Sequence, residues 1–247
     1  MRLDTEVIIQ SRFGEPTLLI EAIPEDRFKD NFRRVIAGAS EAQAASAWKI
    51  MQAMIKEPHG SMVVFAEDAK AEADRLSRQG MLVIPEPLTG DLLASASRID
   101  GSILCDVNGV CHAMGVILDG EANEACTPAR GSRFNSAVRY VLGSSVKRIA
   151  IVKSEDGSLD IMPLLRPRIN RKDFTDAIDA LERADMENYY RPRLYLDDHR
   201  FYALPEDCPR INAALDRLDA MPTEPMVIRL GTTRFSPNPE MNAGYYY

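Results

Sequence analysis

Hydrophobic positions in the central part of the chain alternate between the spacing of strands and the spacing of helices. Short apolar runs bounded by glycine, proline or asparagine indicate strands, and apolar residues three or four positions apart indicate helices. The expected strands are Ser61–Phe65, Ser102–Cys105, Val110–Leu118, Ile149–Val152 and Leu159–Met162, with a further short apolar run at Met81–Ile84. The expected helices are Glu41–Met54, Asp68–Arg78, Gly90–Ser97 and Ser132–Leu142. This alternation predicts an α/β fold with a mixed central β-sheet flanked by helices.

Two turn sequences predict hairpins within this sheet. Val107-Asn108-Gly109 separates the expected strands Ser102–Cys105 and Val110–Leu118. An Asn-Gly pair favours the positive φ values of a type I′ turn, so we expect these two strands to pair directly. Glu155-Asp156-Gly157 separates the last two expected strands in the same way.

The two ends of the chain differ from its centre. Residues 1–40 predict strands at Glu6–Ile9 and Thr17–Glu21 and a helix after Pro24. After Pro163 the pattern becomes basic and then amphipathic. The helices expected there are Asp173–Met186 and Arg210–Met221, followed by a tail that ends in three tyrosines and is expected to be packed or disordered. The predicted organisation is an N-terminal strand-strand-helix extension (1–40), a main domain (41–163) and a C-terminal α/β extension packed on the main domain (164–247).

Charge and composition narrow the classes of partner. The chain has 30 basic and 37 acidic residues and a formal net charge of −7, so the whole molecule has no electrostatic reason to bind nucleic acid or an anionic membrane. The sequence shows neither a signal-peptide apolar segment nor a run long enough to span a bilayer, which predicts a cytoplasmic protein. The spacing of the four cysteines matches neither a disulfide framework nor a zinc motif, so reduced and mostly buried thiols are expected.

Two segments carry candidate chemistry. In the first, Asp100-Gly101-Ser102, a carboxylate and a glycine lead into an apolar strand. Such a carboxylate can bind a divalent cation while the glycine lets a ligand approach the backbone, although the same pattern also suits a simple turn.

In the second segment, Gly131-Ser132-Arg133, a glycine and a hydroxyl residue open an amphipathic helix beside arginines. The free N–H groups of a helix N-terminus and nearby guanidinium groups both bind phosphate. The alternative is a serine N-cap with solvated arginines.

Together the two segments resemble the diadenylate cyclase domain of bacteria and archaea. That family has Asp-Gly-Ala, then Gly-Thr/Ser-Arg-His-Arg-Ala-Ala, and then a Ser-Glu-Glu-type turn after the next strand. The order and spacing are similar here, with Glu155 in the last turn, and the resemblance extends from about Glu41 to Pro163. It implies a nucleotidyltransferase in which two ATP molecules meet between face-to-face subunits of a homodimer or higher homo-oligomer. The products are cyclic di-AMP and pyrophosphate.

The resemblance also implies roles for individual residues. Asp100 and Glu155 are expected to bind Mn²⁺ or Mg²⁺, and Asp100 and Arg133 are the expected catalytic residues. The nucleotide-binding residues are expected to be Gly101, Ser102, Ile117, Gly131, Ser132, Arg133 and Asn135, with the Ile117 backbone facing the adenine.

The sequence departs from the family at one place in particular. Arg133-Phe134-Asn135 stands where the family has Arg-His-Arg, so an imidazole and a guanidinium are missing. Loss of one charged contact to a transition state costs on the order of 10² to 10³ in rate. A catalytically impaired protein that senses ATP or a cyclic dinucleotide and signals through its extensions is therefore the alternative function. A structural or interaction protein with an emptied pocket is the third.

The remaining candidates carry less chemistry. His59, His112 and His199 match no metal-ligand spacing and are expected to be core or surface residues. The basic cluster between Arg166 and Lys172 is expected to be a solvated link, with phosphate binding at a subunit interface as its alternative.

Overall fold

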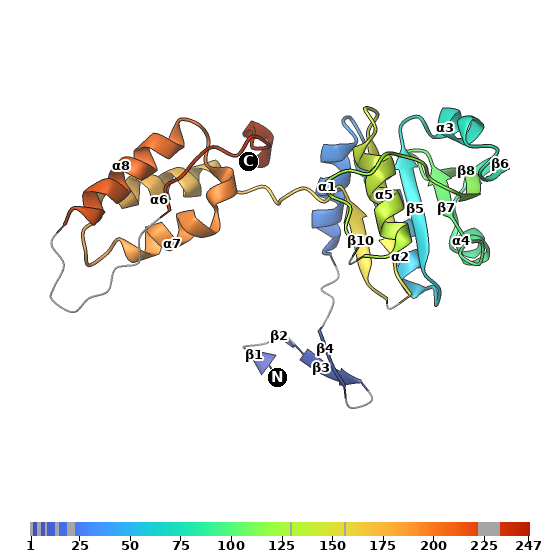
Figure 1. Ribbon diagram of the computed structural model, residues 1–247, viewed down its shortest axis with the longest axis horizontal. Coiled ribbons are helices and arrows are strands. Elements are labelled where there is room, and N and C mark those ends of the chain that lie inside the picture. The colour runs from blue at the N-terminus through green and yellow to red at the C-terminus, as the bar shows by residue number, and fades with distance from the viewer. Residues whose placement is uncertain are drawn as a thin grey trace. The chain divides into compact units, whose positions relative to one another are not determined.

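The computed structural model describes residues 23–128, 130–155, 157–221 and 233–247, together with four short strands before them. These strands are β1 (Arg2–Leu3), β2 (Glu6–Val7), β3 (Ile9–Arg12) and β4 (Glu15–Leu18). Strand pairing is antiparallel within β1–β2 and within β3–β4. The other residues of the two strands predicted in this region lie outside the described residues. The chain divides into two compact units, Met1–Leu165 and Arg166–Tyr247 (Figure 1).

The first unit contains a mixed six-stranded sheet with the order β10-β9-β5-β7-β8-β6. Its strands are β5 (Ser61–Ala66), β6 (Met81–Pro87), β7 (Ser102–Cys105), β8 (Val110–Val116), β9 (Arg148–Lys153) and β10 (Leu159–Met162). Strands β5 and β7 are parallel, and every other neighbouring pair is antiparallel. The predicted mixed sheet and both predicted hairpins, β7–β8 and β9–β10, are confirmed.

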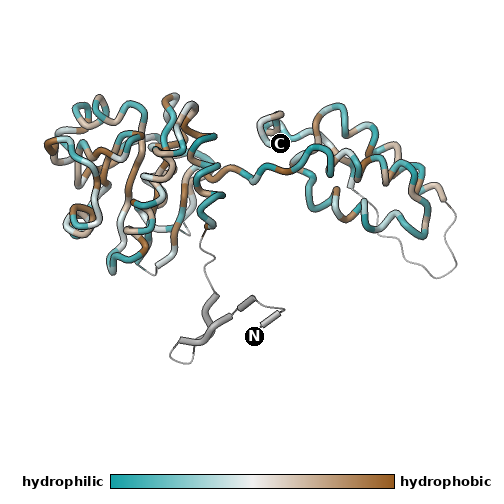
Figure 2. Tube along the Cα trace, turned by 180° about the vertical axis from the view of Figure 1, so that it is seen from behind, coloured by the Kyte–Doolittle hydropathy of each residue, from teal (hydrophilic) through white to brown (hydrophobic). Residues whose placement is uncertain are grey.

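Both faces of the sheet are covered by helices, which explains the continuous apolar run of β5. Val63 and Phe65 face one core, whereas Met62, Val64 and Ala66 face the other. The first core is formed with α1 (Glu25–Val35), α2 (Glu41–Lys56) and α4 (Gly90–Ala96). The second is formed with α3 (Ala69–Arg75) and α5 (Ser132–Leu142). The sheet strands carry much of the apolar character of this unit (Figure 2).

The N-terminal part of the first core depends on aromatic residues of α1. Phe28 and Phe32 are fully buried. The Phe28 ring lies 5.6 Å from Trp48 of α2, and the Phe32 ring lies 5.5 Å from Phe65 of β5, measured between centroids. Aromatic pairs at this separation add to the energy of burial, so α1 is held to α2 and the sheet.

The second unit is helical in its described residues. It contains α6 (Arg171–Arg183), α7 (Tyr190–Asp198) and α8 (Asp207–Asp219), with short 3₁₀ turns at Arg200–Tyr202 and Ala243–Tyr245. Its only described bridge between extended residues joins Ile169 to Tyr246. The α/β character predicted for this extension is therefore limited, within the described residues, to that bridge. The amphipathic patterns confirm α6 and α8, whereas α7 was not expected.

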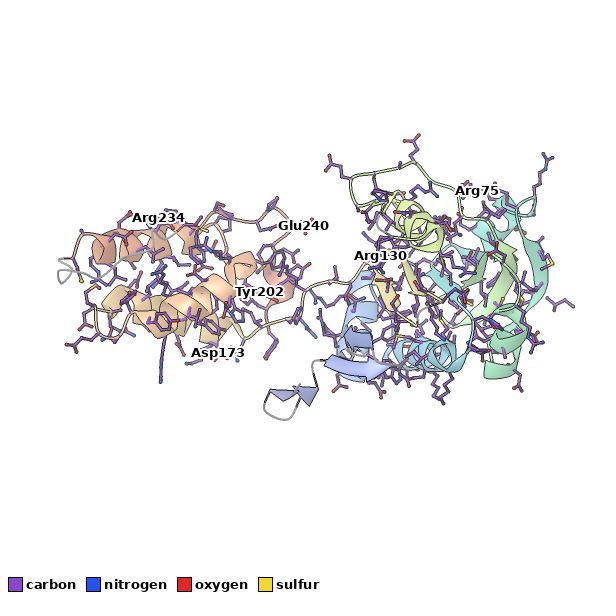
Figure 3. The ribbon with its side chains drawn as sticks, turned by 60° about the horizontal axis from the view of Figure 1, so that its bottom comes forward. Arg75, Arg130, Asp173, Tyr202, Arg234 and Glu240 are labelled. Carbon is purple, nitrogen blue, oxygen red and sulfur yellow. The ribbon has the colours of Figure 1, made fainter. Side chains whose placement is uncertain are left out.

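The tyrosine-rich end of the chain is packed within this second unit. Tyr245 is buried, and its carbonyl accepts a hydrogen bond from the Ile169 backbone N–H at 3.0 Å. Tyr246 donates its hydroxyl to the carbonyl of Tyr202, whose own hydroxyl donates to the carbonyl of Pro167 at 2.7 Å. Figure 3 labels Tyr202 in this unit. Packing, rather than disorder, is the outcome for this tail.

Candidate active site at one end of the sheet

The topology of the sheet brings three separate segments to one end. Strands β5 and β7 run parallel, with Val63 opposite Ile103, so both begin at the same end of the sheet. Strand β9 runs antiparallel to β5, with Lys153 opposite Ser61, so it finishes where β5 begins. The residues before β5, before β7 and after β9 therefore lie close together.

Arg133, in the first turn of α5, links two of these segments. Its Nη2 lies 3.6 Å from Oδ1 of Asp100, and its Nη1 lies 3.0 Å from Oε1 of Glu155. The Asp100 side chain is 97% exposed and that of Glu155 is 65% exposed, so both carboxylates are open to solvent. The predicted convergence of the Asp100 loop with the start of α5 is confirmed.

Gly60 leaves the space in which this ion pair sits. A Cβ at Gly60 would lie 2.6 Å from Nη1 of Arg133 and 2.8 Å from Oε1 of Glu155. The hydrogen bond from Arg133, followed by one from the Gly60 backbone, lowers the pKa of Glu155 below its usual range. Sequence reasoning did not select Gly60, although its place immediately before a fully buried strand is a usable signal.

A pocket of about 390 Å³ opens at this position. The residues that line it are His59, Gly60, Ser97, Arg98, Ile99, Asp100, Arg133 and Glu155. Three predicted site residues, Asp100, Arg133 and Glu155, are therefore brought together. His59 and Arg98 were not predicted site residues, because neither matches a motif in the sequence.

Gly101 and Ser102 serve the β7–β8 hairpin and do not line the pocket. Gly101 has φ of +110°, and a Cβ there would lie 2.5 Å from the carbonyl carbon of Gly115. The glycine thus allows the close approach of a neighbouring strand. The fully buried Ser102 donates its hydroxyl to the carbonyl of Val116 at 3.0 Å. Its expected use as a nucleotide-binding side chain needs correction, because the hydroxyl is buried and already bonded.

Asn135 holds the loop before α5. Its Nδ2 donates to the carbonyls of Thr127, Arg130 and Gly131 at 2.9, 3.0 and 3.3 Å, and its Oδ1 accepts from the Thr127 backbone N–H at 2.9 Å. These bonds occupy the amide, and its expected nucleotide contact stays a prediction. Asn135 fixes the loop that leads into α5.

Phe134 and Arg130 form a second contact beside this loop. Phe134 packs against the core of the α5 face, and the Arg130 guanidinium carbon lies 4.5 Å from the centroid of its ring. Arg130 also pairs with Asp160 of β10. The phenylalanine is therefore a packing residue in the described structure.

The start of α5 is open. Gly131 occupies the N-cap position and Ser132 is the first helical residue, and both are exposed. The N-cap residue makes no side-chain capping hydrogen bond, and the first turn of the helix contains no acidic residue. Their predicted contact with phosphate stays a prediction, consistent with the positive end of a helix dipole.

Ile117 lies just after β8 and does not line the pocket. Its side chain is exposed, and its backbone N–H donates to the carbonyl of Gln79 at 2.8 Å. Its expected contact with adenine through the backbone therefore stays a prediction.

The residues present suit a divalent cation only together with a phosphate ligand. No group of three or more His, Cys, Asp or Glu residues in the described part of the chain is arranged to hold a metal ion. Asp100 and Glu155 supply two oxygen donors, which is the number Mg²⁺ commonly takes from protein when substrate phosphates complete its shell. Mn²⁺ also accepts oxygen ligands of this kind.

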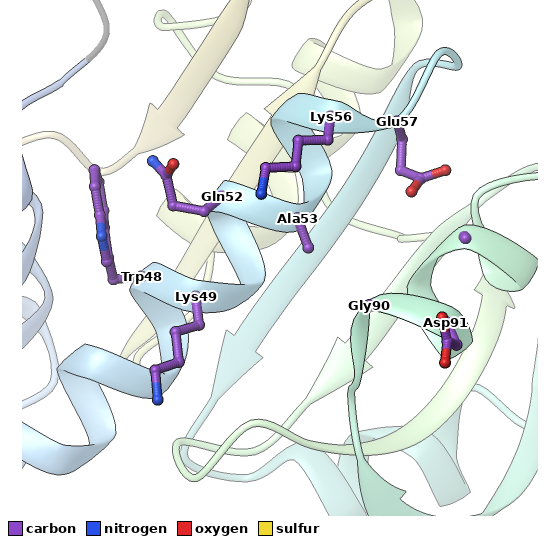
Figure 4. A pocket seen from close by; sticks show the side chains of 9 residues that line it. Trp48, Lys49, Gln52, Ala53, Lys56, Glu57, Gly90 and Asp91 are labelled. Carbon is purple, nitrogen blue, oxygen red and sulfur yellow. The ribbon is translucent and has the colours of Figure 1, made fainter.

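A larger pocket of about 500 Å³ lies between α2 and α4 (Figure 4). It is lined by residues of opposite charge, among them Lys49 and Lys56 on α2 and Asp91 on α4. None of the predicted site residues lines it. The pocket at the end of the sheet is therefore the better candidate for the predicted chemistry.

Two further predictions concern the cysteines and the possibility of a membrane-spanning helix. Cys105, Cys111 and Cys208 are buried free thiols, as expected, and Cys126 is half-buried. Within the described residues, helices that combine bilayer-spanning length with sufficient apolar character are absent.

Comparison with known proteins gives structural likenesses only. No protein-family model matches the chain, and no curated protein matches its sequence. A double mutant of DacA from Staphylococcus aureus is similar in structure, with a TM-score of 0.40 and 19% identity, over 59% of this chain and 94% of that one. A hypothetical membrane-spanning protein from Bacillus cereus has a TM-score of 0.40 and 20% identity, over 53% of this chain and 63% of that one. Likenesses at this level carry no information on activity.

Proposed function

We propose that the pocket at the end of the sheet binds ATP with a divalent cation and that two copies of the chain condense two ATP into cyclic di-AMP. One observation carries the proposal: Arg133 lies between the carboxylates of Asp100 and Glu155 at the rim of a pocket. Guanidinium groups bind phosphate in a bidentate manner, and paired carboxylates bind Mg²⁺ or Mn²⁺. The two carboxylates are exposed and Arg133 is half-buried, so these groups can exchange partners with a ligand.

The proposed reaction makes and breaks one bond in each half-site. The 3′-oxygen of one ATP attacks the α-phosphorus of the other, and the bond from that phosphorus to the β-phosphate bridging oxygen breaks, releasing pyrophosphate. Two such steps convert two ATP into cyclic di-AMP and two pyrophosphates, and each 3′-hydroxyl proton passes through Asp100 to solvent. Arg133 donates to phosphate oxygens as charge develops on the leaving pyrophosphate. A bound divalent cation supplies Lewis acidity toward the phosphate and the 3′-hydroxyl.

A second candidate, a nucleotide sensor without turnover, is favoured by two side chains at the start of α5. Phe134 packs on the core, and the Asn135 amide is occupied by backbone groups, so neither supplies a charge to the pocket. Interactions that form only in the transition state contribute to the rate and not to ground-state binding, so their loss can leave binding intact. A sensor would keep nucleotide affinity through Asp100, Arg133 and Glu155.

The decisive experiment measures binding and turnover on the same preparation. Purified full-length chain is titrated with ATP and Mn²⁺ by calorimetry, and products are quantified by mass spectrometry over a range of protein concentrations. We expect cyclic di-AMP and pyrophosphate, with Arg133→Ala lowering the rate by about 10² to 10³ and Asp100→Asn abolishing it. Arg78→Ala serves as the control because Arg78 is exposed and does not line the pocket.

The three outcomes separate the candidates. Product formation that depends on Asp100 supports the cyclase and rejects the sensor. Binding without product at every protein concentration rejects the cyclase and supports the sensor. Absence of ATP binding rejects both.

A further inference from the structure

We infer that Arg98 and His59 are the groups that receive the terminal phosphates of the nucleotide, an inference that rests on the proposed function. Both residues line the same pocket as Asp100 and Arg133. Neither was marked by a motif, and the proposed reaction does not otherwise use them. They would give the pocket a preference for polyphosphate over nucleoside.

Arg133 alone is a poor receptor for a whole triphosphate. Its two terminal nitrogens already lie 3.6 Å from Asp100 and 3.0 Å from Glu155. A phosphate that binds Arg133 must therefore compete with two carboxylates. In the absence of further cations, a triphosphate would also meet the negative charge of both carboxylates at close range.

Arg98 supplies the missing positive charge. Its side chain is exposed, and among the described residues it has no hydrogen-bond or ion-pair partner. It follows Ser97, the C-cap of α4, and the carbonyl end of a helix favours a cation. An arginine that lines a pocket without a carboxylate partner is free to bind phosphate with both of its terminal nitrogens.

His59 approaches the pocket from the start of β5. It is exposed, and it lines the pocket together with Glu155. A neutral imidazole offers one N–H donor to a phosphate oxygen.

A side-chain contact at the pocket lining brings the two segments close together. The Ser97 hydroxyl donates to the Ala94 carbonyl at 3.0 Å and lies 3.5 Å from Oε2 of Glu57. Ser97 immediately precedes Arg98, and Glu57 stands two residues before His59. The segments that carry both proposed phosphate ligands therefore approach each other at Ser97 and Glu57.

The test compares ligands that differ in phosphate number. Affinities for ATP, ADP, AMP and adenosine are measured by calorimetry with Mg²⁺ on wild type, Arg98→Ala, Arg98→Lys, His59→Ala and the control Arg78→Ala. Loss of a charged hydrogen bond costs about 10- to 100-fold in affinity, so Arg98→Ala should weaken ATP by that factor and leave adenosine unchanged. His59→Ala should weaken ATP about threefold to tenfold, and Arg98→Lys should recover part of the loss.

Failure of this inference differs from failure of the proposed function. If wild type binds ATP, and Arg133→Ala weakens it while Arg98→Ala and His59→Ala do not, the inference is overturned and the proposed function stands. Equal losses for ATP and adenosine would also overturn it, because they indicate a role in base binding or folding. If wild type binds no ATP at all, both the proposed function and this inference are rejected. Thermal unfolding of each variant checks that the affinities refer to folded protein.

Discussion

Replacing Gly60 with alanine should damage the site while sparing the fold. The new Cβ would lie 2.6 Å from Nη1 of Arg133 and 2.8 Å from Oε1 of Glu155, whereas ordinary contacts begin at about 3.4 Å. The guanidinium nitrogen must therefore retreat by about 0.8 Å and the carboxylate oxygen by about 0.6 Å. Both atoms are at the ends of flexible side chains, so the displacement is achieved by rotation and not by movement of the backbone.

The expected change in stability is small. Gly60 is not among the glycines with positive φ, so alanine can adopt its backbone conformation. The entropic gain from alanine is about 0.4 to 1 kcal/mol, and it is opposed by a close contact of 3.1 Å with the Lys153 carbonyl. We expect the free energy of unfolding to change by less than about 1 kcal/mol. The affinity for ATP should nevertheless fall about tenfold, because Arg133 and Glu155 no longer hold their positions.

Two measurements on one variant test this reasoning. Carboxylate chemical shifts followed against pH should show the pKa of Glu155 rising toward its ordinary value, since the hydrogen bonds from Arg133 and Gly60 both weaken. Gly90→Ala is a matched control, because a Cβ at Gly90 meets nothing within 4 Å. An unchanged pKa of Glu155 together with unchanged ATP affinity would refute the role given to Gly60. A large loss of stability would show instead that the Lys153 carbonyl cannot move away from the new Cβ.

Three further predictions concern the supports of the site and the core. Asn135→Ala should lower the free energy of unfolding by about 1 to 2 kcal/mol, because it removes the side-chain hydrogen bonds to half-buried and exposed backbone groups of the loop before α5. Urea unfolding measures this, and a change below about 0.5 kcal/mol would contradict it. Gly101→Ala should lower the free energy of unfolding by about 2 to 4 kcal/mol, because position 101 has a positive φ and a Cβ there would collide with Gly115. A variant as stable as wild type in thermal unfolding would be incompatible with that geometry. The hydrogen bond from Arg75 lowers the pKa of Glu72, so the stability that this carboxylate contributes is complete above its unfolded-state pKa of about 4.3 and is lost as pH falls through the lower folded value. Unfolding curves of wild type and Glu72→Gln should therefore converge at low pH, and a difference that persists there would argue against the linkage.

The periodicity of hydrophobic residues was sufficient to predict most helices and strands of the first unit. The strand β7 and the helix α5 have the predicted bounds, because an Asn-Gly turn and a glycine before a serine mark their ends in the local sequence. Strand β6 extends three residues beyond the predicted run, to Pro87. Two prolines are tolerated there because β6 is an edge strand with an irregular register against β8.

The second unit was less predictable for a physical reason. The segment Tyr190–Asp198 mixes aromatic, apolar and charged residues and contains Pro192, which argues against a helix when taken alone. The proline lies in the first turn, where it removes no intrahelical hydrogen bond. Only Leu196 of α7 is fully buried, so its pattern carries too weak a stripe to be recognised in the sequence.

The candidate site shows the same division between local and non-local information. Motifs identified Asp100, Arg133 and Glu155, which the structure brings together. They did not show that Ser102 and Asn135 bond backbone carbonyls, because whether a polar side chain meets a ligand or a backbone carbonyl depends on the fold around it.

The proposed phosphate-binding groups of the pocket come from three places in the sequence, unlike those of a site built on one helix start. Arg133 stands on α5, Arg98 follows α4, and His59 precedes β5, and the mixed order of the sheet brings all three to one end. A substitution at the start of α5, such as the phenylalanine at position 134, removes a charge from one segment only. The other two segments still supply a guanidinium and an imidazole without changing the packing of that helix. The affinity for nucleotide should therefore depend more on Arg98 than the helix motif alone would suggest.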